Sequence, residues 1–202
     1  MHPDDPRTYW DAEAADFDDE PDHGLTTPEV RQAWVALLDA YLPASRSPVV
    51  DLGCGTGSLS ILLAQRGHPV LGVDVSPKMI TLARRKARAE GLNIDFVIGD
   101  VQTAATPTDA LGAVVSRHLL WAVPDPQAVI ARWSAGLDGD GTYLAIEGVW
   151  DEAGIAPEVV RSALERHFEH VEYTDLTEQA KLWGKDVADH RYAIVGRRRR
   201  LD

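Results

Sequence analysis

Residues 49–58 read Val49-Val50-Asp51-Leu52-Gly53-Cys54-Gly55-Thr56-Gly57-Ser58, a short apolar run followed by three glycines at alternate positions. A run of this length, bounded by turn residues, is typical of a buried strand, and glycines permit a sharp turn into a following helix. In an open α/β sheet, the carboxyl end of such a strand borders the ligand crevice, and the N–H groups of the next helix point into it. This stretch therefore predicts an α/β fold with a ligand-binding loop.

The spacing of the glycines narrows the kind of ligand. A dinucleotide-binding loop would read G-x-G-x-x-G, but here the third glycine comes one residue early and Ser58 stands in its place. Asp51 directly precedes the loop, where a carboxylate can contact a cationic group of a ligand. The loop therefore suits a ligand with an amino-acid end and a nucleoside end, and it disfavours a nucleotide-dependent reductase.

Short apolar strands alternate with amphipathic helices on the carboxyl side of this loop. The alternation predicts βαβ units and a parallel sheet with helices on both faces. The link between the last two expected strands is short for a crossover helix, so we expect that pair to be antiparallel. Strands are expected at 49–52, 69–74, 94–98, 111–116, 142–146, 171–176 and 191–198, and helices from Thr27-Pro28, at 58–66, from Ser76-Pro77 to Gly91, from Asp125-Pro126 as far as Leu137, and at 157–168.

Composition sets further limits. The chain has 202 residues, which fits one domain, and its single cysteine, Cys54, excludes an intrachain disulfide and a cysteine-cluster zinc site. One cysteine fits a reducing, cytoplasmic location. No apolar run approaches the ~20 residues of a membrane helix.

The charge of the chain argues against nucleic acid as a partner. The net charge is −12, and an acidic protein repels a phosphate backbone unless it has a local basic face. Arg197 to Arg200 is the one basic run, and we interpret it as a solubilising end of the last strand. We therefore expect no nucleic-acid partner and no membrane partner.

Three later segments extend the pattern of residues 49–58. Leu71–Ser76 places Asp74 at the end of the second strand, Ile98–Val101 places Asp100 after the third, and residues 115–126 follow the fourth. Together these segments resemble the motifs of class I S-adenosylmethionine-dependent methyltransferases that act on small molecules. The resemblance implies a Rossmann-like, seven-stranded, mostly parallel sheet whose last strand is antiparallel. It also implies one domain over 1–202, with residues 1–45 as a helical lid.

The resemblance implies S-adenosylmethionine as the cofactor and S-adenosylhomocysteine as the product. In this family the acid at the position of Asp74 accepts the ribose hydroxyls, and the acid at the position of Asp100 accepts from the adenine amine. The cofactor-binding residues expected on this basis are Asp51, Gly53, Cys54, Gly55, Gly57, Asp74, Val75, Met79, Asp100, Val101 and Ser116.

Two histidines are candidate catalytic residues. His118 follows the fourth strand at the mouth of the crevice, and a histidine can take a proton near neutral pH; a histidine that only hydrogen-bonds the neighbouring loop is the alternative. His23 lies in the expected lid, where surface exposure is the competing interpretation. We expect no metal site. The expected substrate-binding residues are Trp10, Phe17, Arg117, Trp121 and Trp150.

These observations predict a methyltransferase acting on oxygen or nitrogen of a small-molecule acceptor, as a monomer or homodimer. Methyl transfer is an in-line displacement at a carbon that the sulfonium charge already activates. Alignment of the reacting atoms can supply ~7–11 kcal/mol of the barrier, so the lack of a recognisable catalytic triad is no argument against activity. The alternative is a non-catalytic or regulatory module that binds S-adenosylmethionine on the same fold.

Overall fold

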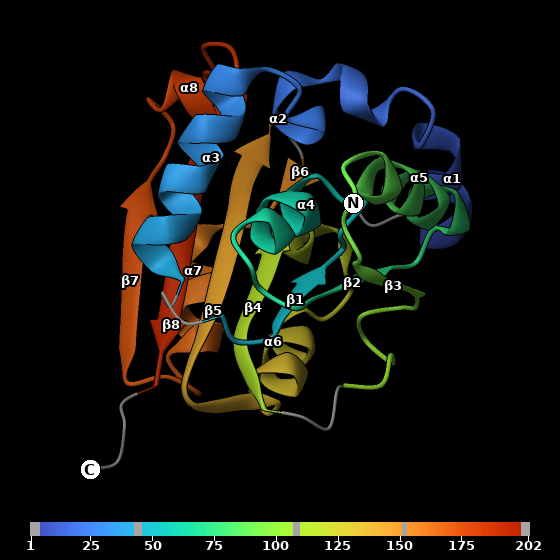
Figure 1. The fold of residues 1–202 in the computed structure, drawn as a ribbon. Coiled ribbons are helices and arrows are strands. Elements are labelled where there is room, and N and C mark those ends of the chain that lie inside the picture. The colour runs from blue at the N-terminus through green and yellow to red at the C-terminus, as the bar shows by residue number, and fades with distance from the viewer. Residues whose placement is uncertain (1–4, 43–45, 107–109, 151–152, 199–202) are drawn as a thin grey trace.

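The computed structural model describes residues 5–42, 46–106, 110–150 and 153–198, and it is built around one twisted sheet with the strand order β3-β2-β1-β4-β5-β8-β7 (Figure 1). Strands β3 to β5 run parallel along this path, whereas β8 is antiparallel to both of its neighbours. A short strand, β6, pairs with β5 outside the path. The predicted mostly parallel sheet with an antiparallel last strand is confirmed. The strands are β1 (Val49–Leu52), β2 (Val70–Asp74), β3 (Asp95–Ile98), β4 (Leu111–Arg117), β5 (Leu137–Trp150), β6 (Ala153–Gly154), β7 (His170–Asp175) and β8 (His190–Arg197).

Helices cover both faces of the sheet. Helices α3, α4, α5 and α8 lie on one face and α6 and α7 on the other (Figure 1). The side chains of Thr27, Ser76 and Asp125 accept hydrogen bonds from the first turns of α3, α5 and α6, as their sequences predict. The helices are α1 (Pro6–Glu13), α2 (Pro21–Gly24), α3 (Pro28–Tyr41), α4 (Ser58–Gln65), α5 (Pro77–Ala89), α6 (Pro126–Ser134), α7 (Pro157–Leu164) and α8 (Ala180–Trp183), with 3₁₀ turns η1 (Phe17–Asp19) and η2 (Leu120–Ala122).

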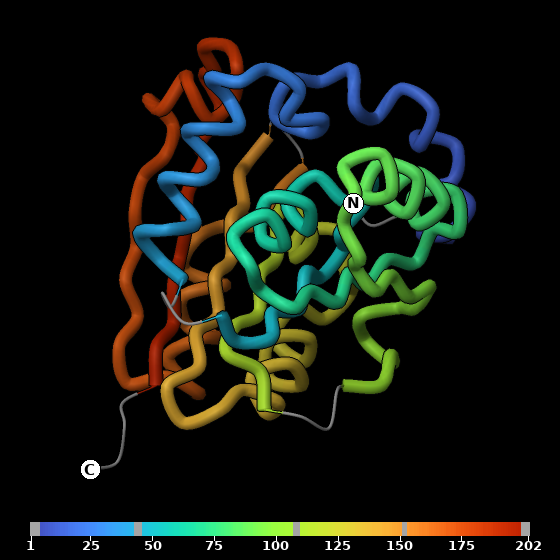
Figure 2. The backbone as a smooth tube through the Cα atoms, viewed as in Figure 1, coloured from blue at the N-terminus to red at the C-terminus, as the bar shows by residue number. Residues whose placement is uncertain are grey.

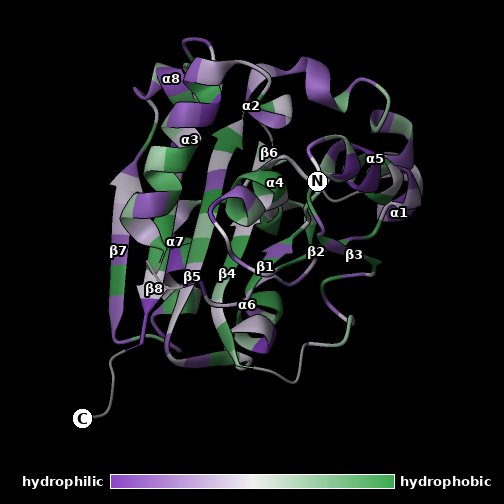
Figure 3. Cartoon of the chain, viewed as in Figure 1, coloured by the Kyte–Doolittle hydropathy of each residue, from purple (hydrophilic) through white to green (hydrophobic). Residues whose placement is uncertain are grey.

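The sheet separates two apolar cores. Figure 3 shows apolar residues along the central strands and polar residues on the outer helix surfaces. Trp133 of α6 anchors one core, and Trp34 of α3 with Trp183 of α8 anchors the other; all three side chains have no exposed area. Each indole N–H donates to a backbone carbonyl, so these tryptophans are buried without an unpaired donor.

Strand β5 departs most from the prediction. It begins at Leu137, which the sequence pattern assigns to the preceding helix, and it continues to Trp150. Helix α6 ends at Ser134 because the chain turns at Gly136, whose N–H donates to the carbonyl of Trp133. Leu137 then pairs with Leu111 of β4. The Gly- and Asp-rich residues 138–141, which read as a turn in the sequence, have no partner in these ladders and form an irregularity within the strand. Pairing resumes at Thr142 and continues with β4, β8 and β6 as far as Trp150.

The N-terminal segment crosses the carboxyl ends of the parallel strands (Figure 2). Residues 5–24 form α1, η1 and α2 along this edge, before α3 returns along the sheet. Residues 1–4 and 43–45 of the predicted lid lie outside the described part of the chain. Across the described ranges, no helix has both the length and the apolar character needed to cross a bilayer.

The basic run at the C-terminus is partly engaged with the body. Arg197 forms an ion pair with Glu172 of β7 at 3.1 Å, and Arg198 donates to the carbonyls of Ser134 and Leu137. Arg199 and Arg200 lie outside the described residues. The interpretation of this run as a strand end stays a prediction.

We expect Gly72→Ala to lower the free energy of unfolding by about 1–3 kcal/mol, because a Cβ on Gly72 would lie 2.5 Å from the Phe96 ring and 2.9 Å from the Cys54 sulfur. Gly139→Ala is the control, since no atom lies within 4 Å of its Cβ position. Urea unfolding of both variants checks the prediction, and equal losses of stability would contradict it.

Candidate active site

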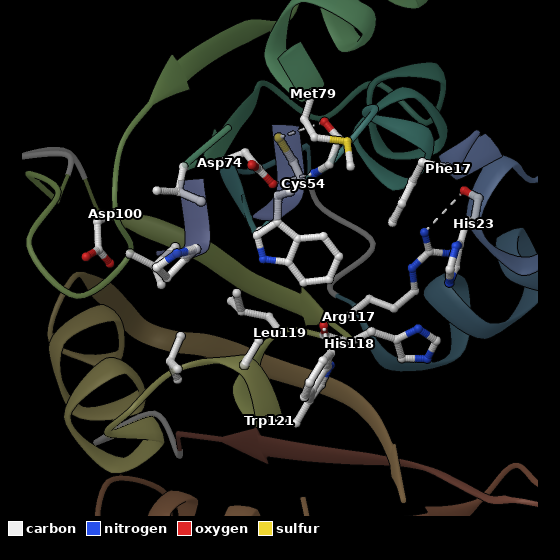
Figure 4. A pocket seen from close by; sticks show the side chains of 18 of the residues that line it. Phe17, His23, Cys54, Asp74, Met79, Asp100, Arg117, His118, Leu119 and Trp121 are labelled. Carbon is white, nitrogen blue, oxygen red and sulfur yellow. Dashed lines mark hydrogen bonds between the residues drawn. The ribbon is translucent and has the colours of Figure 1, made fainter. Parts of the chain in front are cut away.

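A pocket of about 490 Å³ lies where the carboxyl ends of the central strands meet the N-terminal segment. Figure 4 shows that it has two chemically different ends: Asp74, Cys54 and Asp100 lie toward one end, and Phe17, His23, Arg117 and His118 toward the other. The topology explains this meeting, because β1, β2 and β4 are neighbours and their carboxyl ends face the same edge of the sheet.

The glycine loop after β1 forms one wall. Gly53, Gly55 and Gly57 all have positive φ values, of +62°, +52° and +81°, which side-chain-bearing residues rarely adopt. A Cβ on Gly53 would lie 2.8 Å from Leu119, so the glycine lets the loop after β4 approach. Gly53 and Gly55 line the pocket, whereas Gly57, the N-cap of α4, does not.

Asp74 lies at the end of β2, and 8% of its surface is exposed. Its two carboxylate oxygens accept N–H bonds from Gly55 at 2.9 Å and Ser76 at 2.8 Å. Burial raises the pKa of Asp74, while these two bonds act in the opposite direction. Each carboxylate oxygen has a second lone pair, so the group can accept further hydroxyl donors from the pocket side.

The remaining predicted cofactor residues divide into two groups. Val75, Met79, Asp100 and Val101 line the pocket near Asp74, and Asp100 accepts the N–H of Gln102 at 2.8 Å. Cys54 also lines it, but burial raises the pKa of its thiol well above the usual value, which fits a packing role.

The side chains of Asp51 and Ser116 are buried away from the pocket. Asp51 is buried at the end of β1, where it accepts the hydroxyl of Ser60 at 2.5 Å, and burial raises its pKa to about 6. Ser116 is fully buried beside Leu52 in the ladder between β1 and β4. Neither side chain lines the pocket, nor does Gly57, and cofactor contact by these three residues stays a prediction.

Aromatic side chains form the other end of the pocket. The predicted substrate-binding aromatics come from α1 and η1 at the start of the chain and from η2 and β5 in its second half, and the structure brings them together. Unlike the three core tryptophans, they are only partly buried. Their rings meet edge to face, at centroid distances of 5.8–6.3 Å. They are Trp10, Phe17, Trp121 and Trp150.

His118 follows β4 with a left-handed backbone, at φ +53°. Its ring centroid lies 4.9 Å from that of Trp150, and its Nε2 atom is buried with no hydrogen-bond partner in the described part of the chain. Burial, and then the charge of Arg117, lower the pKa of His118 well below its usual value. The imidazole is therefore neutral near pH 7, with a lone pair available.

His23 faces the same space from α2. Its ring stacks on Phe17 at a centroid distance of 4.4 Å and lies 6.1 Å from the ring of His118. Burial, and then Arg117, lower its pKa. His23 thus lines the pocket, and the competing interpretation of a freely exposed lid histidine does not describe its position.

Two arginines hold α2 in place. Arg117, a predicted substrate-binding residue, donates to the backbone carbonyls of Asp22 and His23 and lies over the Trp34 ring at 5.0 Å. Arg191 of β8 pairs with the Asp22 carboxylate at 3.2 Å. Asp22 and Arg191 were not candidates in the sequence, since one lies in an acidic run and the other in a strand without a motif.

Asp22, His23 and His118 also have the chemistry of a metal site. One ligand atom of each lies within 4.8 Å of the others. However, Arg191 already binds the carboxylate of Asp22, and Arg117 contacts its backbone, so two positive charges oppose a divalent cation there. The absence of a metal site therefore stays a prediction, and the cluster is a polar part of the pocket wall.

Acidic residues fasten the N-terminal segment over the pocket. Asp11 accepts the hydroxyl of Ser76 at 2.6 Å, Asp18 binds Lys86 at 2.8 Å, and Glu20 binds Lys185 at 2.6 Å. These contacts reach α5 and the segment after α8. They give the acid-rich start of the chain a structural role.

We expect Asp18→Ala to loosen residues 5–24, because it removes bonds to Lys86 and to the hydroxyl of Thr56. A partly exposed ion pair contributes only about 0–1 kcal/mol, so the effect should be local. Hydrogen exchange in residues 5–24 measures it, with Asp19→Ala on the same turn as the control. Equal exchange in the two variants would show that the ion pair does not hold the segment.

The comparisons with known proteins agree with this geometry. A family model described as "Methyltransferase domain" matches residues 49–141. The chain is similar to a ubiquinone biosynthesis O-methyltransferase of Xanthomonas campestris pv. campestris (strain B100), at 34% identity over 137 residues, covering 67% of this chain and 54% of the relative. The chain thus spans about half the length of the curated relatives it matches.

Two solved structures share the fold. The magnesium protoporphyrin IX methyltransferase of Synechocystis PCC 6803 with bound S-adenosylmethionine superposes with a TM-score of 0.66 at 23% identity, covering 84% of this chain and 78% of that one. The N-methyltransferase NodS of Bradyrhizobium japonicum WM9, in complex with S-adenosylhomocysteine, superposes with a TM-score of 0.73 at 18% identity. The match covers 96% of this chain and 99% of that one. The family match, the sheet order and these similarities lead to one conclusion: residues 49–141 form a methyltransferase domain, and the chain has the fold of the class I S-adenosylmethionine-dependent methyltransferases.

Proposed function

We propose that this chain transfers a methyl group from S-adenosylmethionine to an oxygen atom of a small-molecule acceptor. One observation carries the proposal: a single pocket has a glycine-and-carboxylate end and an aromatic-and-imidazole end. The curated relatives are named O-methyltransferases, which favours oxygen over nitrogen. When bound, the cofactor supplies an electrophilic methyl group on a sulfonium sulfur, and transfer leaves S-adenosylhomocysteine.

The residues of the first end fit such a cofactor. Gly53 and Gly55 line this end with bare backbone, and a Cβ on Gly55 would lie 3.4 Å from the pocket-lining Phe17 ring. The Asp74 carboxylate keeps acceptor capacity toward the pocket. We propose that Asp74 accepts the ribose hydroxyls and Asp100 the adenine amine. Val75, Met79 and Val101 then pack on the flat base between them.

The residues of the second end fit the acceptor. We propose that the neutral imidazole of His118 accepts the hydroxyl proton as the new oxygen–carbon bond forms and the sulfur–carbon bond breaks, with the bonding pair left on sulfur. His23 supports this end from the opposite wall. The partly exposed aromatic rings of the pocket hold the apolar part of the acceptor.

The arrangement of the chain around the pocket belongs to the same proposal. We propose that residues 1–45 act as the lid of a single domain; residues between 5 and 23 line the pocket, whereas α3 packs against the sheet. We propose a monomer or homodimer that acts on a small molecule and needs neither nucleic acid nor membrane. The non-catalytic binding module is the alternative.

Turnover tests the proposal directly. The purified chain is incubated with S-adenosylmethionine and a panel of phenols, carboxylic acids and amines, and S-adenosylhomocysteine formation is measured. We expect turnover with a hydroxyl acceptor. Binding of the cofactor without turnover of any acceptor would favour the non-catalytic module, and turnover of amines alone would overturn the choice of oxygen.

We expect Asp74→Ala to weaken binding of S-adenosylhomocysteine by about 1.5–3 kcal/mol, the usual contribution of hydrogen bonds to a charged group. Isothermal titration calorimetry measures this affinity. Asp95→Ala, at an exposed position of β3, is the control. Unchanged affinity in the Asp74 variant would remove the ribose assignment.

We expect His118→Asn to reduce turnover by about 10²–10⁴-fold, the usual contribution of a general base, while cofactor affinity stays near wild type. Asparagine tolerates the left-handed backbone at this position better than alanine, so the loop is preserved. His167→Asn, in the turn after α7, is the matched control. Wild-type turnover in the His118 variant would leave this residue a packing role.

A further inference from the structure

Glu147 is a carboxyl group inside the sheet that the proposed reaction does not use directly. It lies in β5, and none of its surface is exposed. Burying a carboxylate costs several kcal/mol unless hydrogen bonds compensate for the lost water. Its apolar neighbours in the strand, Ile146 and Ala145, are buried without this free-energy cost. The hydrogen bonds that Glu147 makes are therefore what has to compensate for its burial.

One oxygen of Glu147 makes two bonds to the loop after β4. Oε1 accepts the N–H of Leu119 at 3.0 Å and the N–H of Leu120 at 2.8 Å. These residues begin the 3₁₀ turn η2, which has no side-chain cap of its own. The first N–H groups of a helical turn have no partner within it, so Glu147 supplies from a neighbouring strand what a capping residue would supply locally.

These bonds act on the residues that face the pocket. His118 directly precedes Leu119, and its left-handed backbone is one that a residue with a side chain adopts at a cost. Its carbonyl accepts the indole N–H of Trp121 at 2.9 Å. Leu119 packs against the glycine loop at Gly53. Movement of this short loop would therefore displace three features together: the imidazole of His118, the ring of Trp121 and the contact of Leu119 with Gly53.

We propose that Glu147 is a positioning residue for methyl transfer, which holds the loop of residues 118–121 so that His118 and Trp121 face the acceptor. The inference rests on the proposed function for its effect on turnover, whereas the bonds to the loop stand on the structure alone. Glu147 does not touch the pocket, so it acts through the loop rather than on the reacting atoms.

The environment of Glu147 indicates which substitution best tests the proposal. Burial raises its pKa to about 8, so the carboxyl group is mostly protonated at neutral pH. The second oxygen, Oε2, has no hydrogen-bond partner among the described residues. Glutamine has the same shape and a carbonyl oxygen that can accept both loop N–H bonds, so it reproduces the acceptor and removes the acid.

The experiment compares Glu147→Gln and Glu147→Ala in the full chain, with Tyr143→Phe as the control. Tyr143 is another buried polar residue of β5, and it makes no bond to the loop. Three quantities are measured: amide hydrogen exchange at Leu119 and Leu120, affinity for S-adenosylhomocysteine by calorimetry, and turnover of the best hydroxyl acceptor of the panel.

We expect Glu147→Ala to lose amide protection at both positions and to reduce turnover by about 10²-fold, as a small misplacement of catalytic groups does. Cofactor affinity should change much less than turnover, and Glu147→Gln and Tyr143→Phe should stay close to wild type. Three outcomes overturn the proposal: wild-type turnover in Glu147→Ala, protected amides in that variant, or an equal loss of turnover in Tyr143→Phe. Absence of turnover in the wild-type chain is the failure of the proposed function instead, and the exchange measurement then still decides whether Glu147 holds the loop.

Discussion

The hydrogen bond from the Gly55 N–H to the Asp74 carboxylate is the constraint on which the site depends. It joins the glycine loop of β1 to the end of β2, two segments that the parallel sheet places side by side. The bond is made inside a largely buried region, where a carboxylate is stable only if donors compensate for lost water. The cost of burying Asp74 therefore also fixes the shape of the loop.

Hydrogen bonds from buried ionisable groups also hold the other end of the pocket. Arg117, Arg191 and Glu147 are buried or partly buried ionisable groups, and each is placed by hydrogen bonds to a segment that lines the site. Arg117 and Arg191 hold α2, and Glu147 holds the loop after β4. Polar groups in the interior thus position the histidines and the aromatic walls, while apolar packing of the helices supports the sheet itself.

The N-terminal segment gives the pocket its enclosure. Without it, the aromatic rings of η2 and β5 would face solvent at the edge of the sheet. Its acids bind partners on α5 and near α8, while Trp10 and Phe17 line the pocket, which explains a composition that is both acidic and aromatic. The ion pairs of Asp18 and Glu20 are partly exposed and contribute little to stability, whereas the buried pair of Asp22 with Arg191 holds α2 more firmly.

The sequence by itself determined the mostly parallel sheet, the starts of α3, α5 and α6, and the glycine-and-carboxylate end of the pocket. Glycine spacing, strand-end acids such as Asp74, and caps such as Ser76 are local signals, because each depends on neighbours within a few residues. Only the tertiary structure decided the aromatic-and-imidazole end of the pocket. The meeting of His23 with His118, and the roles of Arg191 and Glu147, join segments that are far apart in the chain, and no local pattern records which side chains long-range packing brings together. The extent of β5 follows the same reason, since Leu137 pairs with β4 and residues 142–149 pair with β8 on either side of the unpaired, turn-like residues 138–141.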